Sequence, residues 1–202
     1  MDYSFESDKL KLLVESYGGV ISSKALEEAG FNRINIYNLK LEGILYKESH
    51  GYYTLAENQP DEYTIIQKRS DKLIYSHATA LFLHGLSDKT PLLLDITVPQ
   101  GDNISRIKKD YQNTRFHYCK KELWDIGIEK VKTPLGYDVS VYDKERCICD
   151  IIKDKEYIDV QIFSMALREY FTDKVCNTNK IIKYSKIFNV EGKVRNYMEV
   201  LL

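Results

Sequence analysis

Residues 30–55 read GFNRINIYNLKLEGILYKESHGYYTL, and this stretch decides the expected fold. Ile36 and Leu39 are apolar and three residues apart, a spacing that places them on one face of a helix. After the Gly43 stop signal, Ile44–Lys47 and Tyr52–Leu55 have the composition of two strands joined by a short turn. The stretch therefore predicts a helix followed by a tight β-hairpin.

Two shorter helical patterns precede this stretch. Leu10, Leu13 and Val14 form an apolar stripe of a first helix, and Ser22 or Ser23 caps a second one. The pair Val20-Ile21 between them suits a short strand that pairs with the hairpin. Three helices and a hairpin describe a winged helix-turn-helix, a fold that places one helix in the DNA major groove. We therefore expect an α+β protein with a winged-helix DNA-binding domain in residues 1–58 and a larger mixed α/β domain in residues 61–202.

The third predicted helix carries the side chains that would read DNA. Arginine can bridge two acceptors of guanine, asparagine can pair with adenine, and lysine suits phosphates. The alternative is an ordinary solvated helix face in a winged-helix protein-interaction module. The expected DNA-binding residues are Asn32, Arg33, Asn35, Tyr37, Asn38 and Lys40 on the helix, and Lys47 and His50 on the hairpin.

The charge balance opposes strong non-specific DNA binding. The whole chain has a net charge of −1, and residues 1–60 carry six Lys/Arg against nine Asp/Glu, a net of −3. Non-specific affinity for phosphate should be weak. The acids Asp2, Glu6, Asp8 and Glu15 fall on or before the first helix, and they could face away from DNA and leave a local basic strip.

The rest of the chain alternates helical and strand patterns. Ala56–Asp61, with Asn58 and Pro60, is a break in composition and the expected linker. Helices are expected at 63–69, 76–86, 105–111, 143–152, 160–171, 179–188 and 191–202. Strands are expected at 92–98, 115–119, 129–132 and 137–141.

Composition favours a soluble cytoplasmic protein. No stretch approaches the roughly 20 apolar residues of a membrane span, and the acidic N-terminus is not a signal peptide. The four cysteines form no zinc-type spacing and are expected to stay reduced.

Two histidines and one aspartate are candidates for chemistry in the larger domain. His77 and His84 are seven apart and share a helix face, but no third metal ligand is evident nearby, so no metal is expected. Asp95 lies within the apolar run LLLDITV, where a charge needs a partner, and the expected partner is a helix end, Arg115 or Arg146. A nuclease would use Asp95 with Glu129, Lys130 and Lys132, but the sequence EKVK lacks the Glu-x-Lys arrangement.

The segments YSHATALFLHGLSDKTP, DITVP and DKERCICDII resemble the AbiEi antitoxins of type IV toxin–antitoxin systems. The resemblance covers residues 7–170. Its motif residues are Ser76, His77, Thr79, Ala80, Leu83, His84, Gly85, Leu86, Asp95, Thr97, Pro99, Asp143, Glu145, Arg146 and Asp150.

The resemblance implies a transcriptional autorepressor and antitoxin of an abortive-infection system. Its partners would be operator DNA, as repeats in its own promoter, and a nucleotidyltransferase-like toxin that is countered without a tight complex. It implies no enzyme activity and no cofactor. The alternatives are a phage-defence nuclease with a winged-helix targeting head and a protein-interaction scaffold.

Overall fold

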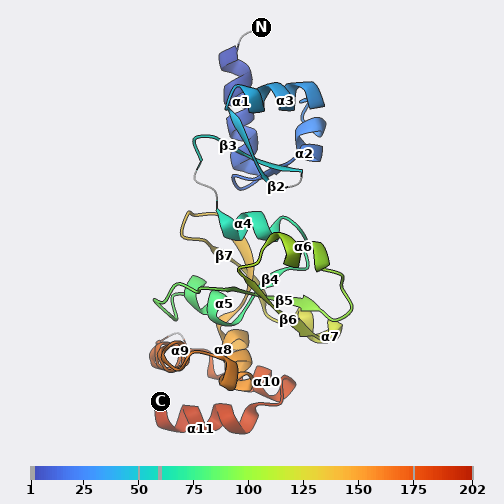
Figure 1. Ribbon diagram of the computed structural model, residues 1–202. Coiled ribbons are helices and arrows are strands. Elements are labelled where there is room, and N and C mark those ends of the chain that lie inside the picture. The colour runs from blue at the N-terminus through green and yellow to red at the C-terminus, as the bar shows by residue number, and fades with distance from the viewer. Residues whose placement is uncertain (1–2, 50, 59–60, 175, 202) are drawn as a thin grey trace. The chain divides into compact units, whose positions relative to one another are not determined.

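The computed structural model describes residues 3–49, 51–58, 61–174 and 176–201. Helices are interspersed with the strands of two β-sheets, which confirms the α+β class (Figure 1). The chain divides into two compact units. Unit 1 comprises residues 1–70 and 132–139, and unit 2 comprises residues 71–131 and 140–202.

Unit 1 begins with the elements that the N-terminal sequence predicts. In chain order they are α1 (Tyr3–Ser16), β1 (Ile21–Ser22), α2 (Ser23–Glu28), α3 (Arg33–Leu41), β2 (Leu45–Ser49) and β3 (Tyr52–Leu55). The three strands form an antiparallel sheet of order β1-β3-β2. Ile21 lies opposite Tyr53, so the predicted pairing of the short strand with the hairpin is confirmed.

Side-chain caps fix where α2 and α3 begin. The Ser22 hydroxyl accepts a hydrogen bond from the backbone N–H of Ala25. The Asn32 side chain accepts one from the N–H of Asn35, while the Asn35 side chain accepts one from the N–H of Asn32. This reciprocal arrangement satisfies two donors that a helix start leaves unpaired. The predicted cap of α3 at Asn32 is confirmed.

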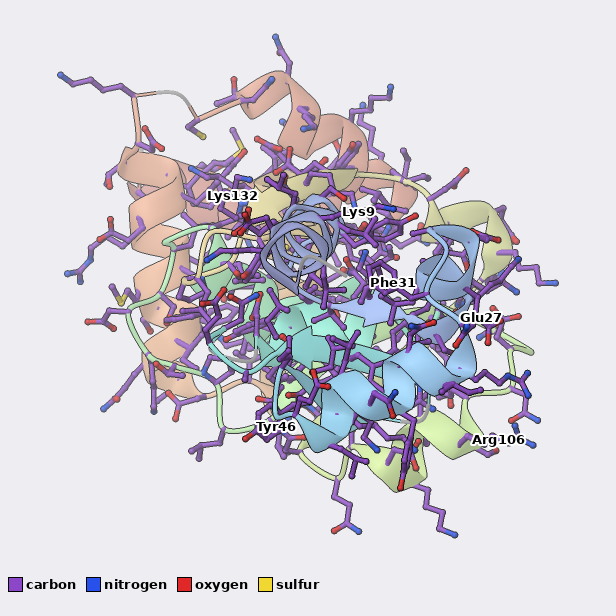
Figure 2. All side chains as sticks on the ribbon, turned by 90° about the horizontal axis from the view of Figure 1, so that it is seen from above. Lys9, Glu27, Phe31, Tyr46, Arg106 and Lys132 are labelled. Atoms are coloured by element: carbon purple, nitrogen blue, oxygen red, sulfur yellow. The ribbon has the colours of Figure 1, made fainter. Side chains whose placement is uncertain are left out.

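A small apolar core lies between the helices and the sheet of unit 1. Ile36 is its contribution from α3, and Leu39 is half-buried beside it. Lys9 lies over the ring of Phe31 at the edge of this core, and Figure 2 shows the two side chains next to each other. The buried members are Leu10, Val14, Ile21, Ala25, Leu26, Phe31, Ile36, Leu45 and Leu55.

Unit 1 also contains α4 (Glu62–Gln67) and a turn from much later in the chain. Asp61 is buried, and its carboxylate accepts hydrogen bonds from the hydroxyls of Thr64 at 2.7 Å and Thr133 at 2.8 Å. The latter bond joins residues 72 positions apart, which helps to place residues 132–139 in this unit. Residues 59–60 of the expected linker lie outside the described residues.

A five-stranded mixed sheet organises unit 2. Its strands are β4 (Ile74–Tyr75), β5 (Leu94–Pro99), β6 (Thr114–Cys119), β7 (Ile128–Lys132) and β8 (Asp138–Tyr142), in the order β6-β5-β4-β8-β7. The last residue of β7 and the first two of β8 belong to unit 1. All six residues of β5 are buried, as the sequence predicts, but the strand begins at Leu94, and Leu92 and Leu93 of the expected strand 92–98 are exposed.

Helices complete unit 2. They are α5 (His77–Leu83), α6 (Ser105–Asp110), α7 (Lys121–Trp124), α8 (Lys144–Lys153), α9 (Val160–Thr172), α10 (Thr178–Ile187) and α11 (Glu191–Leu201), with a 3₁₀ turn at Lys155–Tyr157. α8 packs against α5, α9, α10 and α11 (Figure 1). Its residues 145–152 are buried. The sequence did not predict β4 or α7, which are too short to show a periodicity. Leu202 of the last predicted helix lies outside the described residues.

Among the described helices, none has both the length and the apolar character that crossing a membrane requires.

Candidate functional site

The outer face of α3 exposes most of the side chains that the sequence proposes for DNA contact. Arg33, Tyr37, Asn38 and Lys40 are exposed, whereas Ile36 on the opposite face is buried. Lys47 on β2 is also exposed. His50 lies outside the described residues. The predicted division of α3 into one buried and one exposed face is therefore confirmed.

The cap of α3 restricts two of the proposed DNA-binding residues. The side-chain carbonyl oxygens of Asn32 and Asn35 are engaged in the capping box. An asparagine reads adenine through both its carbonyl oxygen and its amide group. Asn32 and Asn35 therefore cap the start of the helix. Asn38 is the asparagine of α3 whose side chain lies outside this cap.

Four cations of unit 1 line one hollow beside α3. Side chains from α2, α3, β2 and β3 line it. The acid among its lining residues is Glu27, which pairs with Arg33 at 3.2 Å between Oε1 and Nε. Four of the six basic residues in positions 1–60 therefore surround one surface, although this part of the chain is acidic overall. The four are Lys24, Arg33, Lys40 and Lys47.

The histidine of the Ser-His motif has an unusual backbone. His77 begins α5 with a φ of 47°, a region that non-glycine residues seldom occupy. Its imidazole is buried, with Nδ1 at 3.0 Å from the Ser76 hydroxyl and Nε2 at 3.1 Å from a carboxylate oxygen of Asp154. Ser76 occupies the predicted N-cap position, but its side chain caps nothing and accepts a hydrogen bond from Thr97 instead.

Asp95 is fully buried in β5 and holds two side chains of β6. Arg115 donates through Nη2 to one carboxylate oxygen at 2.9 Å, and His117 donates through Nε2 to the other at 2.7 Å. Burial alone would raise the pKa of Asp95, but the hydrogen bonds from His117 and Arg115 outweigh it and hold the pKa below its usual value. The predicted partnership of Asp95 with Arg115 is confirmed. Thr79, another motif residue, accepts a hydrogen bond from the N–H of Asp95.

The His77–Asp154 pair and the Asp95–His117 pair meet where the His77 ring stacks on the His117 ring. The ring centroids are 3.7 Å apart and the planes differ by 14°. One nitrogen of each imidazole and one oxygen of Asp154 lie within 4.8 Å of one another. The expectation that His77 has no third metal ligand nearby is therefore wrong, because β6 and the end of α8 bring His117 and Asp154 to it from distant parts of the sequence.

His84 belongs to a different environment from His77. Its Nε2 lies 2.7 Å from the backbone carbonyl of Tyr142 and 3.6 Å from Glu129. Burial lowers the pKa of His84 and outweighs the opposing effect of the Tyr142 carbonyl and Glu129. Gly85 follows with a φ of 70°, a left-handed conformation that favours glycine just after a helix.

The DKERCICD segment forms a buried polar cluster on α8. The Arg146 guanidinium bonds to the Asp150 carboxylate at 2.9 Å and to the backbone carbonyl of Leu123 at 2.8 Å. It also lies between the rings of Tyr142 and Phe188. Nε and Nη1 of Arg146 donate to acceptors of the α8 helix and of the segment before it, so these motif residues help to hold unit 2 together.

A comparison with solved structures finds a similar fold. The chain is similar to the crystal structure of the RV2827C protein from Mycobacterium tuberculosis, with a TM-score of 0.61 and 14% sequence identity over 91% of this chain and 71% of that chain. No protein-family model matches the chain, and no curated protein does. At this level of identity the likeness shows the fold alone.

The residues named for a nuclease centre have separate partners. Asp95 is held by Arg115 and His117, whereas Glu129 lies by His84 and Lys130 donates to the Ser140 hydroxyl. Lys132 pairs with Asp138 at 2.9 Å across the β7–β8 hairpin. The constellation that the nuclease alternative requires is therefore not gathered around Asp95.

Proposed function

We propose that this chain is a transcriptional autorepressor that binds operator DNA through unit 1. The observation that carries this proposal is the concentration of Lys24, Arg33, Lys40 and Lys47 around the outer face of α3. In this proposal the first 58 residues are a winged helix-turn-helix, α3 is the recognition helix, and the β2–β3 hairpin is the wing.

The physical argument rests on where the charge lies. A protein that neutralises phosphates gains affinity by releasing counterions, and only the charges that face DNA contribute. The acid Glu15 lines a different hollow of unit 1, beside Tyr137 and Lys68. A net charge of −3 over residues 1–60 is therefore compatible with one basic surface, and it predicts weak binding to DNA of random sequence.

The test compares the chain's own upstream DNA with a scrambled duplex of equal length. In a fluorescence anisotropy titration, we expect tight binding to the upstream DNA and much weaker binding to the scrambled one. The double variant Lys40→Ala/Lys47→Ala should lose affinity for both. Lys11, which pairs with Glu57 and is not among the residues that line the hollow, provides the matched control as Lys11→Ala. Equal affinity of the wild type for the two duplexes would refute sequence-specific repression.

For unit 2 we propose an antitoxin role against a nucleotidyltransferase-like toxin. The support is the sequence resemblance, several of whose motif residues belong to the two buried polar clusters of this unit. The toxin would be encoded beside the chain's gene. Cells whose growth this toxin arrests should grow again when the chain is co-expressed with it. Because these motif residues hold the fold, the informative comparison is between wild type and Lys40→Ala/Lys47→Ala, which should still protect if protection does not require DNA binding. Loss of protection in that variant would assign part of the antitoxin function to unit 1.

A further inference from the structure

We propose that His77, His117 and Asp154 bind a divalent transition-metal ion of the Zn²⁺ class. The three side chains come from the start of α5, the middle of β6 and the residue that follows α8, all within unit 2. This site goes beyond the proposed function, since neither DNA binding nor toxin neutralisation requires it. Two imidazoles and one carboxylate are ligands that Zn²⁺ and related ions accept, and they leave coordination positions open for water.

The distances suit one ion once the two rings turn toward it. The three prospective ligand atoms lie within 4.8 Å of one another. Atoms bound to one Zn²⁺ at about 2.0–2.1 Å stand about 3–4 Å apart, so the atoms must approach, and the stacked rings of His77 and His117 must tilt so that their in-plane lone pairs converge on the ion. Nε2 of His77 and the Asp154 carboxylate are already 3.1 Å apart.

The partners of each imidazole favour metal binding. His117 donates its Nε2–H to Asp95, which leaves Nδ1 as the nitrogen with a lone pair for a metal. His77 has Nδ1 beside the Ser76 hydroxyl, which can either donate or accept, and presents Nε2 to Asp154. Metal-binding histidines usually have their second nitrogen held in this way, by a carboxylate or another polar group that orients the ring.

The backbone of His77 provides an independent observation. A φ of 47° at a buried non-glycine residue is an unfavourable conformation, and it persists only where the surroundings enforce it, as they do at functional sites. Here it brings the His77 ring into a stack with His117. The ion would enter from the side of Asp154, whose side chain is 37% exposed, whereas that of His77 is 4% exposed.

The thiols of the chain are poor competitors for the ion. Cys147 and Cys149 are buried, and burial raises the pKa of the Cys149 thiol to about 12. Burial also raises the pKa values of Cys119 and Cys176. Because a metal must displace the thiol proton, a raised thiol pKa weakens metal binding at neutral pH.

The experiment titrates the full chain with Co²⁺ and then with Zn²⁺, after treatment with a chelator. We expect one Co²⁺ per chain, visible d–d absorption without a thiolate charge-transfer band, and displacement by Zn²⁺ measured by calorimetry. Asp154→Asn, which keeps the hydrogen bond to His77, and His117→Gln should each weaken binding at least about tenfold. Glu156→Gln makes the same charge change two residues away and should bind like wild type.

Circular dichroism melts without metal separate loss of binding from loss of fold. Asp154→Asn should melt close to wild type, because its side chain is partly exposed and the amide can still accept from His77. Absence of binding to the wild type would overturn the proposal and leave a closed hydrogen-bonded cluster. Unchanged affinity in both Asp154→Asn and His117→Gln, or a thiolate band, would overturn it as well by placing the ion elsewhere.

Discussion

The α3 surface of unit 1 and the polar clusters of unit 2 use the same residue types in opposite ways. On α3, Arg33 is exposed and its partner is a single glutamate, so its guanidinium remains accessible to a ligand. In unit 2, Arg146 is 2% exposed and is surrounded by acceptors and aromatic rings. An exposed charge costs little to keep and little to remove, whereas a buried charge supports the fold only while all its partners are present. Substitutions in the two regions should therefore affect different measurements.

The largest expected effect is on stability in unit 2. Arg146→Ala removes a buried cation and leaves the Asp150 carboxylate and two backbone carbonyls without it. Breaking a buried pair by removing one member typically costs about 3–5 kcal/mol of the free energy of unfolding. Guanidinium denaturation followed by circular dichroism measures the loss. Arg195→Ala is the matched control, because it removes a half-exposed arginine paired with Glu191 on α11 and should cost less than about 1 kcal/mol.

The second effect concerns Asp95, which ties β5 to β6. In Asp95→Ala, Arg115 and His117 lose the carboxylate, but both are partly exposed and can turn to water. We expect a loss of about 1–3 kcal/mol, measured by the same denaturation with a chelator present. Asp138→Asn, which breaks an exposed pair with Lys132, should change stability by less than about 1 kcal/mol. Equal effects of the two substitutions would contradict the distinction between buried and exposed pairs.

These two cases also show what the sequence can and cannot reveal. The stripes on α1 and α3, the cap at Asn32 and the strand LLLDITV are local patterns, so helix and strand periods predict them. The partner of Asp95 was predictable as a class, because a charge in an apolar strand needs an opposite charge. Local patterns could not predict which side chains from distant segments of the chain contact each other.

The His77–His117–Asp154 cluster is the clearest example. His117 stands alone in RFHYC, and Asp154 follows a helix end among other charges, so neither shows a metal-ligand spacing relative to His77. The parallel register of β5 and β6, with Thr97 opposite His117, places His117, and the packing of α8 against α5 places Asp154 near His77. The bond from Asp61 to Thr133 is hidden for the same reason. Local sequence specifies the elements, and the order of strands in the sheet decides which side chains meet.

The third effect concerns Arg33, on the exposed face of α3. Arg33→Ala should leave the free energy of unfolding almost unchanged, because the pair with Glu27 is exposed. If Arg33 reads a guanine, the same substitution should weaken binding to the upstream DNA by roughly 1–3 kcal/mol and relax specificity at one position. Anisotropy titrations on duplexes with each base at that position measure the effect. Full affinity in Arg33→Ala would move the reading surface away from the start of α3.

A smaller effect is expected for a lysine that contacts phosphate. Lys40→Ala should weaken binding to all duplexes alike and reduce the slope of log affinity against log salt by about one. Titrations over a series of salt concentrations give this slope. Lys9, which lies over the Phe31 ring and is not among the residues that line the hollow, is the control, and Lys9→Ala should leave the slope unchanged. An altered slope in Lys9→Ala would mean that the basic surface extends beyond the hollow.

The smallest effect is the pH dependence contributed by His84. Burial lowers its pKa in the folded chain, so below pH of about 6.5 the unfolded chain binds more protons than the folded one. The free energy of unfolding should therefore fall as the pH decreases through this range, and the contribution should level off below the folded pKa. The facing charged groups are Glu129, Asp143 and Lys144.

The substitution His84→Gln isolates this contribution, because glutamine can still donate to the Tyr142 carbonyl but does not titrate. Denaturation of both proteins at pH values above and below 6.5, with a chelator present, gives the two pH slopes. Carboxylates elsewhere contribute equally to both, so the difference between the slopes belongs to His84. We expect the shallower slope in His84→Gln. A steeper slope in the variant would mean that the Tyr142 carbonyl and Glu129 outweigh burial, and that His84 gains a proton on folding.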